Sequence, residues 1–161
     1  MAMAASDQNQ SQAGTRVPFF VPLFNPIARR MLNLGIPLGP NSVLTVSGRK
    51  SGQPRSTPVA LVDIGGRRWI IGTFGEVNWV RNLRATPDAT ITFKRRAYSV
   101  HAAELSVEQR ARFFRETLIP YVNRIPLGRF LIGTVLGAGE ILADPDGAAT
   151  RHPVFELTNR N

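Results

Sequence analysis

Hydrophobic and polar residues alternate with a period of two through the middle of the chain, a pattern typical of half-buried strands. Turn residues interrupt it at Gly65-Gly66 and at Lys94-Arg95-Arg96, where hairpins are expected. The pattern therefore predicts an antiparallel sheet. Its strands are expected at Ser42–Ser47, Ser56–Ile64, Arg67–Thr73, Ala89–Phe93 and Ala97–Leu105.

Helical periodicity appears in two places. A short helix is predicted over Asn78–Ala85, with Trp79 and Leu83 on one side. Ser106 and Gln109 form a capping box that opens a second helix, and apolar residues recur at helical spacing behind it.

The C-terminal part is read as two final strands, Gly139–Ala143 and Val154–Thr158, joined by the turn-rich segment Asp144–Pro153. The apolar run Phe130–Ala138 is far shorter than the ~20 residues of a membrane span. About six strands with a few short helices predict a mainly β fold with helices (α+β), a small barrel with helical decoration.

The N-terminal part differs in composition. Residues 1–16 are rich in Ala, Ser, Gln and Asn and are expected to be a disordered tail, so residues 17–161 form a single domain. Phe19–Phe24 is unusually apolar, and Asn25-Pro26 is expected to open a short helix. The apolar segment has two readings: a strap packed on the core, or a lip that touches a membrane surface or an apolar substrate.

The net charge of +9 is concentrated, because +7 of it lies between Thr45 and Val100. Such a field favours an anionic partner. Aromatic residues do not interleave with the basic ones, which argues against nucleic acid. The chain has no cysteine, and His101 and His152 match no ligand spacing, so neither a disulfide nor a metal site is expected. No secretion signal is recognisable, and a cytoplasmic location is expected.

The segment Gly48–Thr57 carries the clearest chemistry. Glycines permit tight turns that aim backbone N–H groups inward, while side chains add cations and hydroxyls. These side chains are Arg49, Lys50, Ser51, Arg55, Ser56 and Thr57. The combination suits a phosphate or a carboxylate cluster, although a solvated basic hairpin loop has the same composition.

Three features follow one another along the chain: GRKSGQPRSTP, the Gly65-Gly66 hairpin and NWVRNLRATPD. In this order they resemble the deazaflavin-dependent nitroreductase family, over about Asn41–Leu105. The resemblance implies a split β-barrel of FMN-binding-like type that uses coenzyme F420. By position, Arg49, Lys50, Ser51 and Arg55 would bind its phosphate and acidic tail. Alongside the ring system would lie Ser56, Thr57, Pro58 and Val59. Backbone amides of Thr73, Phe74 and Gly75 would contact the polar edge of the ring, and the site would be closed by Asn78, Trp79 and Asn82.

Nitroimidazole-reducing members have a longer, lysine-containing loop before the tryptophan, where this chain has only Gly75-Glu76-Val77. The expected reaction is therefore hydride transfer from reduced F420 to an electron-poor, hydrophobic substrate such as an enone, quinone or unsaturated lipid. No catalytic side chain is assigned. Tyr98, Tyr121, His101 and solvent are the candidate proton sources.

Two alternatives stay open at this stage. One is a non-catalytic protein that binds a deazaflavin, a fatty acid or another lipid at the membrane surface. The other keeps the barrel and replaces F420 by FMN. In either case the protein is expected as a monomer or homodimer, cytoplasmic or peripheral to the inner face of the cell membrane.

Overall fold

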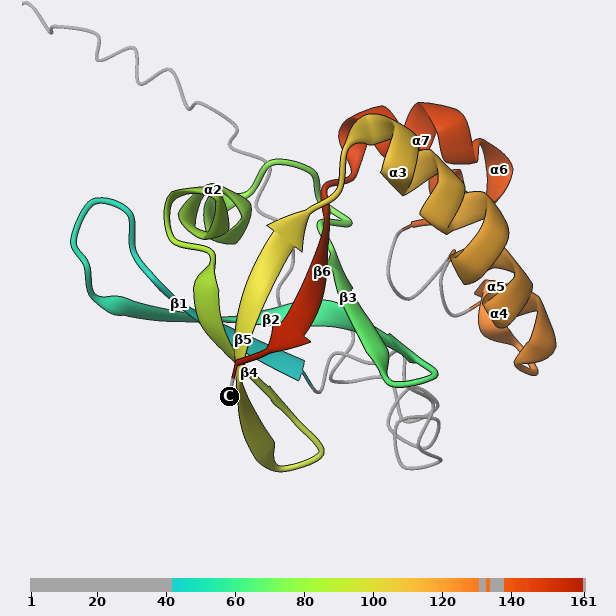
Figure 1. Ribbon diagram of the computed structural model, residues 1–161. Helices are drawn as coiled ribbons and strands as arrows, with labels where there is room; N and C mark the ends of the chain where they lie inside the picture. Colours follow the sequence, from blue (N-terminus) through green and yellow to red (C-terminus); the bar gives the residue numbers. More distant parts are fainter. Residues whose placement is uncertain (1–41, 131–132, 134–137, 161) are drawn as a thin grey trace, which may run out of the picture.

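The computed structural model describes residues 42–130, 133 and 138–160. Six antiparallel strands close into a barrel in the order β1-β2-β3-β6-β5-β4 (Figure 1). The strands are β1 (Ser42–Ser47), β2 (Pro54–Ile64), β3 (Arg67–Ile71), β4 (Asp88–Phe93), β5 (Arg96–Glu104) and β6 (Val154–Asn159). The predicted mainly β architecture is confirmed.

The long strand β2 changes partner halfway along its length. Residues Pro54–Val59 pair with β1, and residues Ala60–Ile64 pair with β3. Within the described part of the chain, the edge of Pro54–Val59 that faces away from β1 therefore has no strand partner. This edge begins where the loop Gly48–Gln53 ends.

The barrel interior is filled by the inward-facing residues of every strand, as the period of two requires. Leu44, Leu61, Ile91 and Phe155 are at most 2% exposed. Helix α2 (Asn78–Ala85) packs against this interior through its apolar side, which belongs to the same buried cluster.

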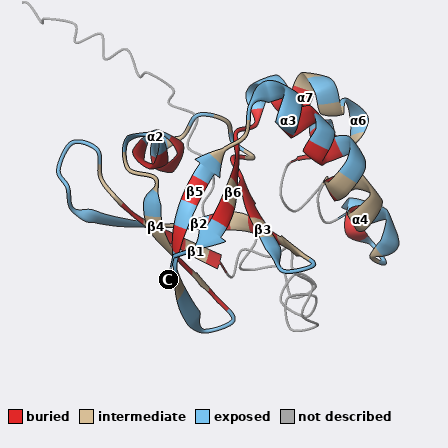
Figure 2. Ribbon diagram, in the orientation of Figure 1, coloured by how far each residue is buried: buried red, intermediate tan, exposed pale blue. Residues whose placement is uncertain are grey.

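A second buried cluster covers the outer face of β2, β3 and β6. Alternate residues of β3 serve the two clusters, because Ile70 points into the barrel and Trp69 and Ile71 point outward. The outer layer consists of α3 (Val107–Arg112), η1 (Phe113–Leu118), α4 (Ile119–Arg124), α5 (Gly128–Phe130), α6 (Gly139–Ala143) and α7 (Pro145–Arg151). Figure 2 shows buried residues both along the strands and on the helix faces toward them.

The helix that begins after Ser106 is longer than its sequence suggests. The predicted capping box is present, with Ser106 Oγ accepting from the Gln109 N–H and the Gln109 side chain accepting from the Ser106 N–H. Pro120 has no N–H for an α-helical hydrogen bond. The residues just before it form the π-helical segment η1. The Ile119 N–H donates to the Phe114 carbonyl, and helix continues as α4.

Two predictions for the C-terminal part were wrong. Gly139–Ala143 is helix α6 and not a strand, and the supposed loop Asp144–Pro153 contains α7. Asp144 caps α7 by accepting from the Gly147 N–H, and Pro145 supplies the fixed φ of a first helical turn. The barrel consequently has six strands and a larger helical layer than expected.

The other predicted strands and α2 are present. β2 begins at Pro54, two residues early, β3 ends at Ile71, two residues early, and the ends of β4, β5 and β6 differ by one residue. The N-terminal tail, the apolar segment Phe19–Phe24 and the helix after Asn25 lie outside the described residues. No helix in the described part of the chain is long and apolar enough to cross a membrane.

Candidate cofactor site

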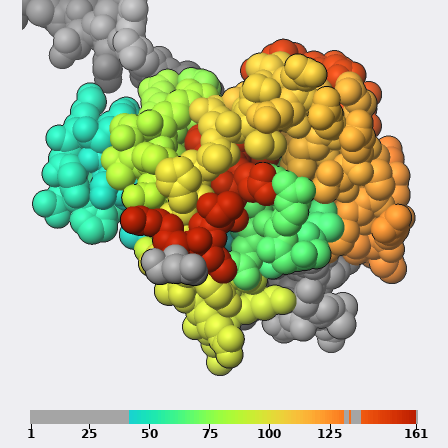
Figure 3. Space-filling model, viewed as in Figure 1, coloured from blue at the N-terminus to red at the C-terminus, as the bar shows by residue number. Residues whose placement is uncertain are grey.

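The cationic loop between β1 and β2 is closed by its own backbone. The Gly48 N–H donates to the Gln53 carbonyl at 2.8 Å, and the Gly52 N–H donates to the Gly48 carbonyl at 2.7 Å. Gly52 has a φ of +66°, which glycine adopts without strain. The loop projects from the barrel on the flank opposite the helical layer (Figures 1 and 3).

Arg49 joins this loop to helix α2. Its main-chain N–H and its Nη1 both donate to Asn82 Oδ1, at 3.2 Å and 2.9 Å. Asn82 is only 5% exposed, and a buried amide oxygen needs such donors. Asn78 Oδ1 lies farther from the guanidinium, at 3.4 and 3.5 Å. The structure thus brings the two sequence motifs into direct contact.

Lys50 and Arg55 are exposed beside Arg49. Among residues 42–130, 133 and 138–160, none of these three cations forms an ion pair. By contrast, Arg67, Arg68 and Arg84 are all paired with carboxylates. The loop therefore presents positive charge that acidic residues of the described chain do not neutralise.

The predicted hydroxyl donors are partly engaged within the protein. Ser51 Oγ accepts from the Gln53 N–H at 3.3 Å, and Ser56 Oγ shares a hydrogen bond of 2.8 Å with Thr45 Oγ1. Each hydroxyl has further capacity to bond. Thr57 is half-buried and Pro58 exposed on the unpaired edge of β2, whereas the Val59 side chain points into the barrel core.

The loop after β3, Gly72–Gly75, folds tightly on itself. The Thr73 N–H donates to the Ile71 carbonyl at 3.0 Å, and the Gly75 N–H donates to the Gly72 carbonyl at 2.9 Å. Of the three amides predicted to meet the cofactor, only that of Phe74 has no backbone acceptor in the described chain. The Phe74 side chain is 62% exposed.

The three predicted residues of α2 have different surroundings. Asn78 is exposed at the helix start, and Asn82 is the buried acceptor for Arg49. Trp79 is 8% exposed and packs in the barrel interior, with its ring centroid 5.9 Å from that of Phe155. In this structure the indole therefore contributes to the core that supports the site.

A charged network holds the far side of the Gly72–Gly75 loop and α2. Arg84 pairs with Glu76 and with Glu104, both at 2.7 Å, and Glu104 also pairs with Arg110. The hydrogen bond from Arg84 lowers the pKa of Glu104 and, in turn, raises the pKa of Arg84. Burial lowers the pKa of Arg110, against the attraction of Glu104. Glu76, which follows Gly75, is therefore occupied by its ion pair with Arg84.

The candidate proton donors have other partners. His101 Nδ1 lies 2.9 Å from Asp88 Oδ1 across the β4–β5 pair, and Tyr98 packs beside the Phe93 ring with the Arg68 guanidinium over both rings. Tyr121 lies in the helical layer, where burial raises its pKa. None of the three belongs to the cationic loop, the unpaired edge of β2 or the Gly72–Gly75 loop.

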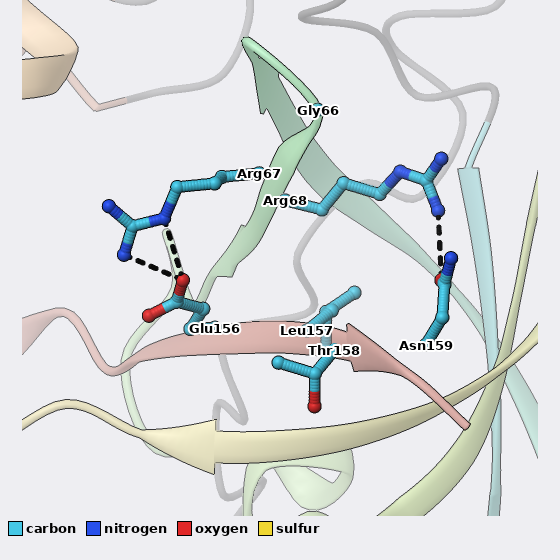
Figure 4. A pocket seen from close by; sticks show the side chains of 7 residues that line it. All are labelled: Gly66, Arg67, Arg68, Glu156, Leu157, Thr158 and Asn159. Carbon is cyan, nitrogen blue, oxygen red and sulfur yellow. Dashed lines mark hydrogen bonds and ion pairs between the residues drawn. The ribbon is translucent and has the colours of Figure 1, made fainter. Parts of the chain in front are cut away.

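A small hollow of about 240 Å³ lies between the start of β3 and β6 (Figure 4). Arg67 and Arg68 line it, but Arg67 pairs with Glu156, and Arg68 donates to Asn159 and pairs with Asp63. It lies at the end of β3 opposite the Gly72–Gly75 loop. Its cations are already neutralised, so it is a weaker anion site than the loop between β1 and β2.

Sequence reasoning missed one buried polar residue next to the site. His152 is 7% exposed, and its Nδ1 lies 3.2 Å from the Gly72 carbonyl oxygen. No motif or spacing marks this histidine, because its neighbours come from separate parts of the chain.

The site combines unpaired cations, hydroxyls, a free strand edge and one unpartnered amide. These features define a barrel protein that can accept a ligand with a flat polar ring and an acidic tail. A donor set of this kind fits coenzyme F420, whose phosphate and glutamates need cations and whose ring needs backbone donors.

Residues 29–124 match the model of the F420H(2)-dependent quinone reductase family. The chain belongs to this family. It is therefore an F420-dependent reductase with coenzyme F420 as its cofactor, which confirms the predicted enzyme class and cofactor.

The chain is also similar to several solved structures. For an F420-H2 dependent reductase (FDR-A), identity is 21%, coverage is 74% of this chain and 94% of that chain, and the TM-score is 0.48. The heme storage protein HutZ from Vibrio cholerae is 13% identical, over 81% and 89% of the two chains, with a TM-score of 0.43. An FAD-binding protein from Mesorhizobium loti is 11% identical, over 81% and 89%, with a TM-score of 0.41. The family assignment rests on the sequence match alone.

Proposed function

We propose that the loop Gly48–Gln53, the unpaired edge of β2 and the loop Gly72–Gly75 together bind coenzyme F420, and that the protein transfers hydride from it to a quinone. The observation that carries this proposal is the set of three neighbouring cations, Arg49, Lys50 and Arg55, with no acidic partner in the described chain.

Arg49 is oriented by Asn82, while Lys50 and Arg55 extend from an exposed loop and strand. In this arrangement Lys50 and Arg55 bind the phosphate and glutamate carboxylates, and Arg49 adds a fixed charge at the base of the loop. Charge-assisted bonds of this type contribute about 1.5–3 kcal/mol each. Ser51, Ser56 and Thr57 add hydroxyl donors along the same path.

Ser56–Val59 and the Gly72–Gly75 loop would hold the ring system. The Phe74 N–H is the backbone donor available for its polar edge, because the neighbouring amides of Thr73 and Gly75 already have acceptors. A fixed donor of this kind stabilises charge that develops on the ring. Reduced F420 supplies the hydride. The core-packed Trp79 holds α2 against this side of the barrel, while Asn78 is exposed at the start of the helix.

The substrate is proposed to be a quinone or another electron-poor, apolar acceptor. The description of the family favours a quinone. The exposed Phe74 side chain offers an apolar surface beside the ring site, and flat aromatic substrates pack well on such a ring. None of Tyr98, Tyr121 and His101 lies in the described part of the site, and we propose that water supplies the proton to the reduced product. Contact of the N-terminal apolar segment with a membrane stays a prediction.

The test is reduction of a soluble quinone by chemically reduced F420, followed by the return of the oxidised deazaflavin absorbance. We expect turnover that needs both protein and F420, and no turnover when reduced FMN replaces F420. Turnover with an enone and no turnover with any quinone would refute the proposal of a quinone substrate while leaving the cofactor site intact.

A further inference from the structure

His152 connects the helical layer to the proposed cofactor loop. It follows α7 and precedes β6, and its ring bridges two acceptors: Nδ1 lies 3.2 Å from the Gly72 carbonyl oxygen, and Nε2 lies 3.1 Å from Glu140 Oε2. Glu140 belongs to α6 and also pairs with Arg151 of α7. The imidazole is only 7% exposed, so water cannot easily substitute for either partner.

The Gly72–Gly75 loop rests on the same short segment. The Gly72 N–H donates to the Pro153 carbonyl at 2.7 Å. A side chain at Gly72 would lie 3.1 Å from Pro153 Cδ, and one at Gly75 would lie 3.4 Å from the Arg151 carbonyl oxygen. Both ends of the loop therefore touch Arg151–Pro153, and a shift of His152 would move the loop.

Two oxygen atoms hold the ring, one at each nitrogen. A carbonyl oxygen only accepts, and an ionised carboxylate only accepts. Hydrogen bonds from Arg151 first and His152 second lower the pKa of Glu140. Because each ring nitrogen lies within hydrogen-bond distance of one of these oxygens, the imidazole is held at both ends. Glu140, Arg151 and the Gly72 carbonyl are the charged and polar groups around the ring.

We propose that His152 is a positioning residue for the coenzyme: its ring bridges Glu140 and the Gly72 carbonyl, and this bridge fixes the loop so that the Phe74 N–H meets the deazaflavin ring. The inference rests on the proposed cofactor site. It assigns His152 no contact with coenzyme or substrate. The helical layer thereby sets the geometry of a loop on the barrel.

Two conservative variants separate the two halves of the bridge. The amide of His152→Asn can place a donor near the former Nδ1, toward Gly72, whereas the amide of His152→Gln reaches the former Nε2 position, toward Glu140. We expect His152→Asn to bind oxidised F420 within about threefold of wild type and His152→Gln to bind about tenfold more weakly, which corresponds to about 1.4 kcal/mol. Wild-type affinity in both variants would overturn the proposal.

The bridge can be tested without the coenzyme. The chain has two histidines, so nitrogen NMR of histidine-labelled protein is assigned by comparison with a His101 variant. We expect the His152 nitrogen signals to shift in Glu140→Gln, and unchanged signals would overturn the proposal. Should wild-type protein fail to bind F420, the proposed function falls, while this measurement still decides whether the bridge exists.

Discussion

Asn82 accepts two hydrogen bonds from Arg49, one from its main-chain N–H and one from its guanidinium. The two residues are 33 positions apart, on the loop after β1 and on α2. The asparagine is buried, so this single amide oxygen fixes both the base of the cationic loop and the direction of one of its charges.

Replacement of Asn82 by Ala should therefore loosen the loop. The Arg49 N–H loses its acceptor, and we expect a loss of about 1–2 kcal/mol in the free energy of unfolding and a roughly tenfold weaker affinity for F420. Chemical denaturation and fluorescence titration measure the two effects. Asn78→Ala is the matched control, because its oxygen is exposed and 3.4 Å or more from the guanidinium. Equal effects in both variants would mean that the Arg49–Asn82 contact has no special role.

Lys94 and Arg95 occupy the left-handed region, with φ of +49° and +62°. The β4–β5 turn is therefore of the type that prefers Asn-Gly. We expect Lys94→Asn combined with Arg95→Gly to stabilise the protein by about 0.5–1.5 kcal/mol, measured by urea denaturation. The turn lies at the end of β4 opposite the end that pairs beside the Gly48–Gln53 loop, so the affinity for F420 should stay unchanged. A lower stability would show that the two cations stabilise the turn by other contacts.

Much of the barrel could be predicted from the sequence, because alternation and turn residues act locally. β1, α2 and the capping box at Ser106 follow from such short-range signals. The error at Asp144-Pro145 was avoidable. An N-cap residue followed by proline opens α7, the same signal that predicted a helix at Asn25-Pro26.

The rest of the site depends on long-range contacts that no local pattern encodes. The Arg49–Asn82 bond, the change of partner along β2 and the buried bridge of His152 all join distant segments. The resemblance to the deazaflavin-dependent family implied that Thr73, Phe74 and Gly75 would offer three amides. The turn geometry uses two of them internally and leaves that of Phe74.

Acid should destabilise the protein through Glu104. Its pKa is lowered in the folded state, chiefly by the hydrogen bond from Arg84. A carboxyl group whose pKa is lowered by folding stabilises the protein at pH values above the ordinary glutamate pKa. This stabilisation is lost as the pH falls through the folded-state pKa. In Glu104→Gln the stability should be about 1–3 kcal/mol lower at neutral pH and should depend less on pH below about 5. Urea denaturation at several pH values checks this, and parallel profiles of variant and wild type would contradict it.

Phe74 should matter for the substrate more than for the coenzyme. Its ring is exposed, so Phe74→Ala should fold normally and retain its main-chain N–H. We expect F420 affinity within about threefold of wild type and a KM for quinone raised about tenfold, from lost aromatic contact of about 1 kcal/mol or more. Phe74→Leu is the control for apolar area. Steady-state kinetics with one soluble quinone measures KM and kcat separately. An unchanged KM would show that Phe74 does not contact the substrate.

The most direct test of the cofactor site compares F420 with its phosphate-free, tail-less deazaflavin in calorimetric titrations of wild-type protein and of Lys50→Ala/Arg55→Ala. The double variant should bind F420 about 100-fold more weakly and lose part of its salt dependence, since two charge-assisted contacts disappear. Its affinity for the tail-less ring should equal that of wild type. The charge-matched Lys94→Asn/Arg95→Gly variant should bind both ligands normally. Equal F420 affinity in wild type and Lys50→Ala/Arg55→Ala would contradict the account.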